Sequence, residues 1–257
     1  MHRALIPQWL ELLEAACAEV PTPFLDLIID QAAGDRPLIP VVKAVHPSLP
    51  WHSLFTGLPE EGAEELAPLL VRVDLRQSIQ RSWLRGLLNE AAGKPQVLTL
   101  GSTWSFDALA TYLGRCLEAR NGGQLGLLRY YDPRLFLLLI RDVLEPEQRR
   151  QVLRPAVFWS WPDHDGVPCR LLGLGEPEES AAAFERIELS DPQIDTLMCA
   201  SDATRALDDD VPASEKAGRA AEQCFQLAYA AMREASAANL IDDPQRVALL
   251  RQRLAQA

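Results

Sequence analysis

Two periodicities of apolar residues divide the first part of the chain into strands and helices. Short apolar runs rich in branched and aromatic side chains are typical of strands, whereas apolar residues at steps of three and four are typical of helices. The strand pattern occurs at residues 24–30, 51–57, 69–74, 96–101, 125–131, 156–161 and 168–174. The helix pattern occurs at 5–19, 77–92, 106–119 and 135–143, and Pro146 begins a further short helix.

The pattern changes after Gly175, where a polar spacer precedes segments that are all helical. Helices are expected over 191–207, over 214–238 and after Pro244. The order of elements predicts an α/β fold, or an α+β fold, for residues 1–175, with a mixed sheet flanked by helices. Residues 176–257 are expected to form an acidic, helical C-terminal subdomain.

The segment Arg129-Tyr-Tyr-Asp-Pro-Arg134 is predicted to be the corner at which a buried strand over 125–131 gives way to a helix. Asp132 stands at the N-cap and Pro133 at the first helical position, where its missing N–H costs nothing. Arg129 needs a partner because an unpaired buried charge is costly, and Asp132 is the nearest candidate in sequence. The corner is therefore interpreted as structural. The alternative is that its polar groups, Arg134 among them, bind a partner.

Charge restricts the classes of partner. The 257-residue chain has a formal net charge of −11, which argues against nucleic acid and against an anionic membrane surface. The charge is uneven, since residues 171–257 hold 16 acidic and 8 basic side chains, against 20 and 17 in the first 170. The C-terminal third is thus the acidic part of the protein.

The five cysteines are widely spaced, and no CxxC motif occurs, so neither a disulfide framework nor a zinc site is predicted. The N-terminal stretch lacks the basic start and the continuous apolar run of a signal peptide. No window has about 18 uncharged apolar residues, which a membrane span would require. We therefore expect a cytoplasmic location with reduced thiols.

Catalytic signatures are weak throughout. Ser102 follows a predicted strand without a GxSxG motif, and His46 and His52 have no suitably spaced third ligand. Neither a Walker A motif nor GxGxxG occurs. No catalytic residue, metal ligand or cofactor is therefore predicted. A serine-dependent hydrolase that pairs Ser102 with His164 stays as a lesser alternative, which requires the two side chains to lie within hydrogen-bond reach.

Trp159 and Trp161 lie two residues apart in a predicted hairpin strand, so their side chains point to the same face. An Asp-Gly turn at 165–166 separates this strand from its partner. Two such tryptophans belong either to the core or to a binding surface, where tryptophan is enriched.

The order of several segments resembles the family of adaptor chaperones of the bacterial type VI secretion system. The matching pieces are residues 25–30, 53–57, 66–71, 98–102, 109–115 and the corner Arg129-Tyr-Tyr-Asp-Pro-Arg134. The resemblance covers about residues 20–175, and the corner is its most specific piece. The proline-rich segment 31–50 fits the family pattern loosely, and the residues after about 180 fall outside it.

The resemblance implies a non-catalytic protein that binds a toxic effector and promotes its loading onto the VgrG spike. The implied partners are therefore the effector and VgrG, with no nucleic acid and no membrane. An immunity protein, which binds and neutralises a toxin through its acidic C-terminal third, is the alternative.

Overall fold

The computed structural model describes residues 2–34 and 37–256, and the chain divides into two compact units. The first unit comprises Met1–Leu137 and Glu145–Glu188, and the second comprises Leu138–Leu144 and Leu189–Ala257. The chain thus enters the second unit briefly, returns to the first, and leaves it after Glu188. None of the helices in the described ranges is long and apolar enough to cross a membrane.

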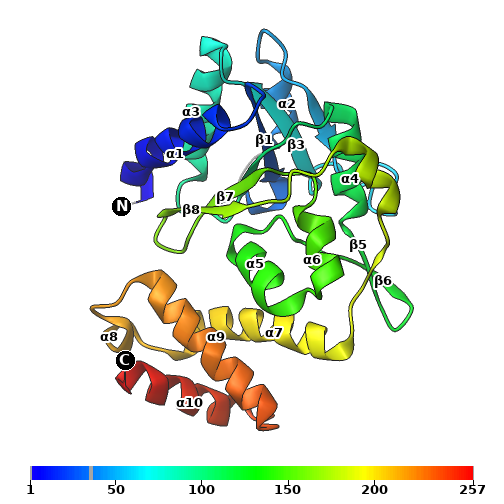
Figure 1. Cartoon of the computed structure of the whole chain (residues 1–257). Coiled ribbons are helices and arrows are strands. Elements are labelled where there is room, and N and C mark those ends of the chain that lie inside the picture. The colour runs from blue at the N-terminus through cyan, green and yellow to red at the C-terminus, as the bar shows by residue number, and fades with distance from the viewer. Residues whose placement is uncertain (1, 35–36, 257) are drawn as a thin grey trace. The chain divides into compact units, whose positions relative to one another are not determined.

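A six-stranded sheet forms the centre of the first unit, in the order β2-β3-β1-β4-β7-β8, with every neighbouring pair antiparallel (Figure 1). The strands are β1 Phe24–Asp30, β2 Trp51–Ser53, β3 Pro68–Asp74, β4 Val97–Gly101, β7 Phe158–Pro162 and β8 Pro168–Leu172. The mixed α/β architecture predicted from the sequence is confirmed.

A smaller sheet, in the order β6-β5-β9, consists of β5 Glu118–Asn121, β6 Gln124–Leu127 and β9 Ile187–Glu188. The helices of the first unit are α1 Ile6–Ala18, α2 Ile39–Lys43, α3 Ser78–Ala91, α4 Phe106–Arg115, α5 Pro133–Leu138 and α6 Pro146–Leu153. Three short 3₁₀ helices span His2–Leu5, Gln31–Ala33 and Glu178–Ala183.

Alternation along β1 separates the two faces of the six-stranded sheet. Leu27 and Ile29 pack in one hydrophobic cluster with Trp9 of α1 and Leu88 of α3. Because successive side chains of a strand point to opposite faces, Asp26 and Asp30 lie on the other face. That second face therefore holds two buried carboxyl groups, both of which need partners.

The second unit is helical, as predicted for the C-terminal region. It contains a π-helical turn Leu139–Val143, α7 Asp191–Arg205, a π-helical turn Ala206–Asp210, α8 Ala213–Lys216, α9 Ala221–Ala237 and α10 Asp243–Gln256. Ser190 and Gln193 form a capping box that begins α7. The single helix predicted over 214–238 is instead two helices, α8 and α9, interrupted at Gly218 with a φ of 82°.

Candidate protein-binding site at the start of helix α5

The corner differs from its prediction in one element. The predicted strand over 125–131 ends at Leu127, and β6 is largely exposed. Leu128, Tyr130 and Tyr131 are buried but irregular, because the backbone turns twice. Tyr130 N donates to Leu128 O at 2.8 Å, and Asp132 N donates to Arg129 O at 3.1 Å. Apolar side chains in this segment thus indicated burial correctly and strand geometry wrongly.

The helix start at Asp132 and Pro133 is confirmed. The Asp132 Oδ1 atom accepts a hydrogen bond from the backbone N of Arg134 at 3.0 Å, and Pro133 is the first residue of α5. The same carboxylate accepts two hydrogen bonds from the guanidinium of Arg134, at 3.1 Å from Nε and 2.7 Å from Nη2. Asp132 therefore caps the helix and fixes the orientation of Arg134 at the same time.

The predicted direct pairing of Arg129 with Asp132 is wrong. Arg129 Nη2 donates instead to Asp30 Oδ2 at 2.6 Å, across 99 positions of sequence. Asp132 is occupied by Arg134, and Asp30 stands at the end of β1, where the corner reaches it. Arg129 and Asp30 are too far apart in sequence for their spacing to indicate this pairing. The available signal was Asp30 itself, because a carboxylate at the end of an apolar strand needs a partner when it is buried.

Two ion pairs with the same arrangement join Arg129 to Asp30 and Arg134 to Asp132. We call Arg129 and Arg134 the arginine pair. The carboxylate side chains of Asp30 and Asp132 are 1% and 3% exposed, whereas the side chains of Arg129 and Arg134 are 47% and 43% exposed. The acidic groups thus lie inside and the guanidinium groups reach the surface. Each arginine is anchored by a carboxylate that solvent hardly reaches.

Electrostatics couples the members of this cluster. Burial raises the pKa of Asp30, and the nearby charge of Asp132 raises it further, whereas Arg129 and the Ala32 N–H oppose the shift. Burial also raises the pKa of Tyr131 to about 12, so its phenol stays protonated near neutral pH. The Tyr131 ring lies 5.7 Å from the Arg129 guanidinium carbon, which adds a cation–π contact.

Residues 27–151 match the family model described as a domain of unknown function (DUF4123). No curated protein and no solved structure matches the chain. The arginine pair and both of its carboxylates lie within the DUF4123 match. Trp159 and Trp161 lie after it.

The interpretation of Trp159 and Trp161 as an exposed binding surface is wrong. The two residues are 0% and 4% exposed. They do share one face, and both rings pack on Phe136 of α5, at centroid distances of 5.0 and 5.2 Å. Ser160 points to the opposite face and accepts a hydrogen bond from Trp9 Nε1 at 2.9 Å. The tryptophans are therefore core residues that hold α5, and with it the corner, against the sheet.

Ser102 does not form the pair that a serine hydrolase would need. Its hydroxyl donates to Pro155 O at 2.6 Å and accepts from Trp104 N at 3.2 Å. The residue is buried, and both of these partners are backbone atoms. Within residues 2–34 and 37–256, no group of three His, Cys, Asp or Glu side chains is placed to hold a metal ion.

Sequence reasoning missed a third ion pair, which is buried on both sides and lies on the same sheet face as Asp30. Asp26 of β1 and Arg72 of β3 are directly opposite in the register. Arg72 donates to both carboxylate oxygens, at 2.7 and 2.9 Å, and also to Trp104 O at 3.1 Å. Burial raises the pKa of Asp26, and the two hydrogen bonds from Arg72 oppose that shift. Each apolar strand has one charged residue in its interior, Asp26 in β1 and Arg72 in β3, and this was the available signal.

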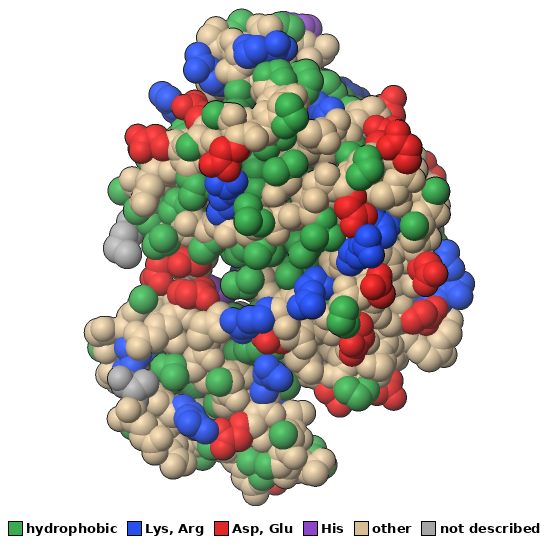
Figure 2. Space-filling model, in the orientation of Figure 1, with side chains coloured by type: hydrophobic (Ala, Val, Ile, Leu, Met, Phe, Trp, Pro, Cys, Tyr) green, Lys and Arg blue, Asp and Glu red, His purple; other side chains and the backbone are tan. Residues whose placement is uncertain are grey.

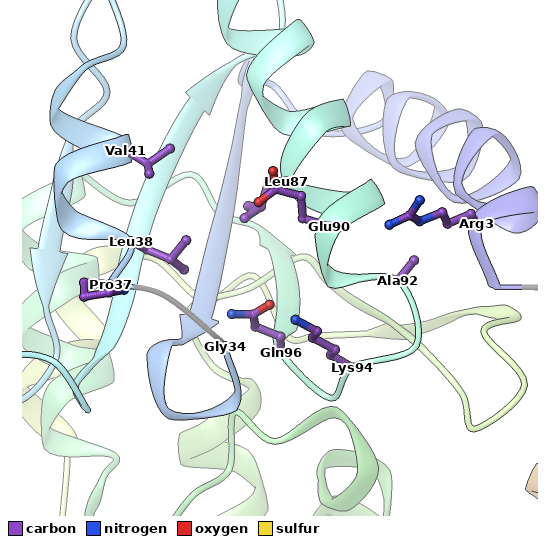
Figure 3. A pocket seen from close by; sticks show the side chains of 10 residues that line it. All are labelled: Arg3, Gly34, Pro37, Leu38, Val41, Leu87, Glu90, Ala92, Lys94 and Gln96. Carbon is purple, nitrogen blue, oxygen red and sulfur yellow. The ribbon is translucent and has the colours of Figure 1, made fainter.

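A surface pocket of about 450 Å³ lies elsewhere in the first unit, between α2 and the end of α3 (Figure 3). Leu38, Val41 and Leu87 line one part of it, and Glu90 and Gln96 belong to its polar part. Arg3 and Lys94 also line the pocket. The pocket also adjoins Gly34 and Pro37, on either side of the two residues that the structure does not describe.

Proposed function

We propose that this protein is a non-catalytic adaptor of a type VI secretion system, which binds a toxic effector in the cytoplasm and promotes its loading onto the VgrG spike. The observation that carries the proposal is the DUF4123 match over residues 27–151, which contains the complete Arg129–Asp30 and Arg134–Asp132 corner. The DUF4123 family is associated with type VI secretion effector adaptors.

The corner is suited to protein binding rather than to bond-making chemistry. Its carboxylates are engaged in ion pairs, so neither is placed as a free general base. Its arginines are oriented and partly exposed, and arginine is enriched at the centres of protein interfaces. On the face drawn in Figure 2, Lys and Arg side chains are interspersed with Asp and Glu, which does not favour a nucleic-acid surface.

Capture of the two partners tests this function. The tagged full chain is expected to capture both the VgrG spike and a toxin from the bacterium that produces it. The control is an unrelated acidic protein of similar charge that carries the same tag, because it shows whether charge by itself causes capture. Capture of neither partner would contradict the proposal.

The immunity alternative predicts a different outcome. An immunity protein protects cells that express the toxin and does not associate with the spike. Protection without spike binding would therefore replace the adaptor proposal, whereas spike binding without protection supports it.

A further inference from the structure

We propose that the arginine pair, Arg129 and Arg134, is a binding site for the side-chain carboxylates of an acidic segment in a protein partner. The proposal rests on the proposed function for the identity of that partner, effector or spike. The chemistry of the site rests on the geometry alone.

The first argument is the number of donors that the arginine pair leaves available. A guanidinium group has five N–H donors in a planar fork. Arg134 uses Nε and one N–H of Nη2 to bind Asp132, and Arg129 binds Asp30 through Nη2. Considering only the described residues, Nη1 of Arg134 binds no acceptor. Each arginine therefore keeps N–H groups with which to bind an external carboxylate.

The second argument is that these donors are held in place before a partner arrives. Arg134 is fixed by three hydrogen bonds to one carboxylate, counting that of its backbone N. Arg129 is fixed by Asp30 and by the ring of Tyr131. Side chains that are already ordered lose less conformational entropy on binding, so more of the interaction energy contributes to affinity.

The third argument is the direction of the local charge. Because the carboxylates of Asp30 and Asp132 are buried, a partner meets the two half-exposed guanidinium groups. The two arginines belong to one turn of the chain, because Asp132, which binds the Arg134 guanidinium at 2.7 Å, donates its backbone N to Arg129 O at 3.1 Å. The exposed guanidinium groups favour an acidic segment, and the net charge of −11 of the chain disfavours a polyanion such as DNA.

The chain contains a matched control for this site. Arg76 donates to Asp74 through its backbone N at 2.9 Å, through Nε at 3.0 Å and through Nη2 at 2.9 Å. This is the same contact over the same two-residue spacing as that of Arg134 with Asp132. The Arg76 side chain is also more exposed, at 68%. Substitution of Arg76 therefore removes an equivalent exposed cation outside the arginine pair.

The experiment uses the full chain and a short fluorescent peptide of alternating Glu and Gly, with a Gln-for-Glu peptide as the neutral probe. Fluorescence anisotropy measures Kd for the wild type, for the Arg129→Gln/Arg134→Gln variant and for Arg76→Gln. We expect the acidic peptide to bind the double variant about tenfold more weakly or worse, and Arg76→Gln to bind like the wild type. Added NaCl is expected to weaken wild-type binding most.

Equal affinity of the wild type and the double variant for the acidic peptide would overturn the site. Binding of the Gln peptide as tightly as the Glu peptide would also overturn it, as would binding of a DNA duplex through the same arginines more tightly than the acidic peptide. If the Gln variant does not fold, Arg129→Lys/Arg134→Lys decides, because it keeps both charges and loses the planar fork. That variant is expected to bind the acidic peptide several-fold more weakly than the wild type. Unchanged affinity in this folded variant would overturn the site.

Capture of the spike and effector by the same variants separates this proposal from the adaptor function. Capture by the wild type and equally by the folded arginine variants contradicts the arginine-pair proposal and leaves the adaptor function intact. Arginine-dependent binding of the acidic peptide, with capture of neither protein, supports the chemistry of the site and contradicts the adaptor function.

Discussion

Arg129 donates a 2.6 Å hydrogen bond to Asp30, and this contact ties the segment before α5 to the end of β1. We expect replacement of Asp30 by Ala to lower the free energy of unfolding by about 1–3 kcal/mol, because the Ala32 N–H and Arg129 both lose their acceptor. A double-mutant cycle with Arg129→Ala, measured by urea unfolding, is expected to give a coupling of about 0.5–1 kcal/mol, since Arg129 is half-exposed. Strict additivity of the two substitutions would contradict the pairing.

Asp132 combines a helix cap with an ion pair. Replacement by Ala is expected to cost about 1–3 kcal/mol of unfolding free energy, because α5 loses its cap and Arg134 loses its partner. Asp74→Ala is the matched control. It removes the same Asp–Arg contact around a far more exposed arginine, and we expect a loss below about 1 kcal/mol. Equal losses would show that the corner has no special role in stability.

The buried pair of Asp26 and Arg72 gives a larger effect. Asp26→Ala leaves the Arg72 guanidinium buried without a counter-ion, which is expected to cost about 3–5 kcal/mol. The double variant Asp26→Leu/Arg72→Met removes both charges and keeps apolar volume in the core. Denaturant unfolding is therefore expected to find it more stable than Asp26→Ala, and the reverse order would contradict the explanation.

Alkaline pH is expected to destabilise the protein. Burial raises the pKa of Cys17 from 9.0 to about 12, that of Cys116 from 9.0 to about 12 and that of Tyr131 from 10.0 to about 12. Between pH values of about 9 and 12, the unfolded chain releases protons that the folded chain retains. Below pH 9 these groups contribute fully to the free energy of unfolding. Above pH 9 that free energy therefore falls as the pH rises.

The variant Tyr131→Phe checks the origin of this effect, because it removes one of the titrating groups and keeps the ring. Melting temperature plotted against pH is expected to fall less steeply in this variant than in the wild type. Identical slopes would assign the alkaline loss to other groups.

Much of the fold could be predicted because it depends on local periodicity. Strand β1 was predicted at its observed bounds, β3 and β4 to within one residue, and the helix start at Pro133 from the capping residue before it. The apolar side chains of Leu128, Tyr130 and Tyr131 predict a strand, but such side chains are buried in irregular segments too, so this pattern alone does not distinguish strand from coil.

The candidate site was predicted in part. The residues of the corner were visible in sequence, but the partner of Arg129 was not, because β1 and the corner are joined only by the tertiary fold. Trp159 and Trp161 illustrate the same limit. Their shared face followed from the strand period, whereas their burial depends on Phe136 of α5, a different element.

The adaptor function is tested most directly by the amount of toxin delivered by living cells. The measurement compares the effector secreted by the wild-type bacterium, by a strain that lacks this protein, and by that strain complemented with the wild-type chain. Loss of effector secretion in the deletion strain is expected, with restoration on complementation and with secretion of an unrelated type VI substrate unchanged. Undiminished secretion of every effector in the absence of this protein would contradict the proposed function.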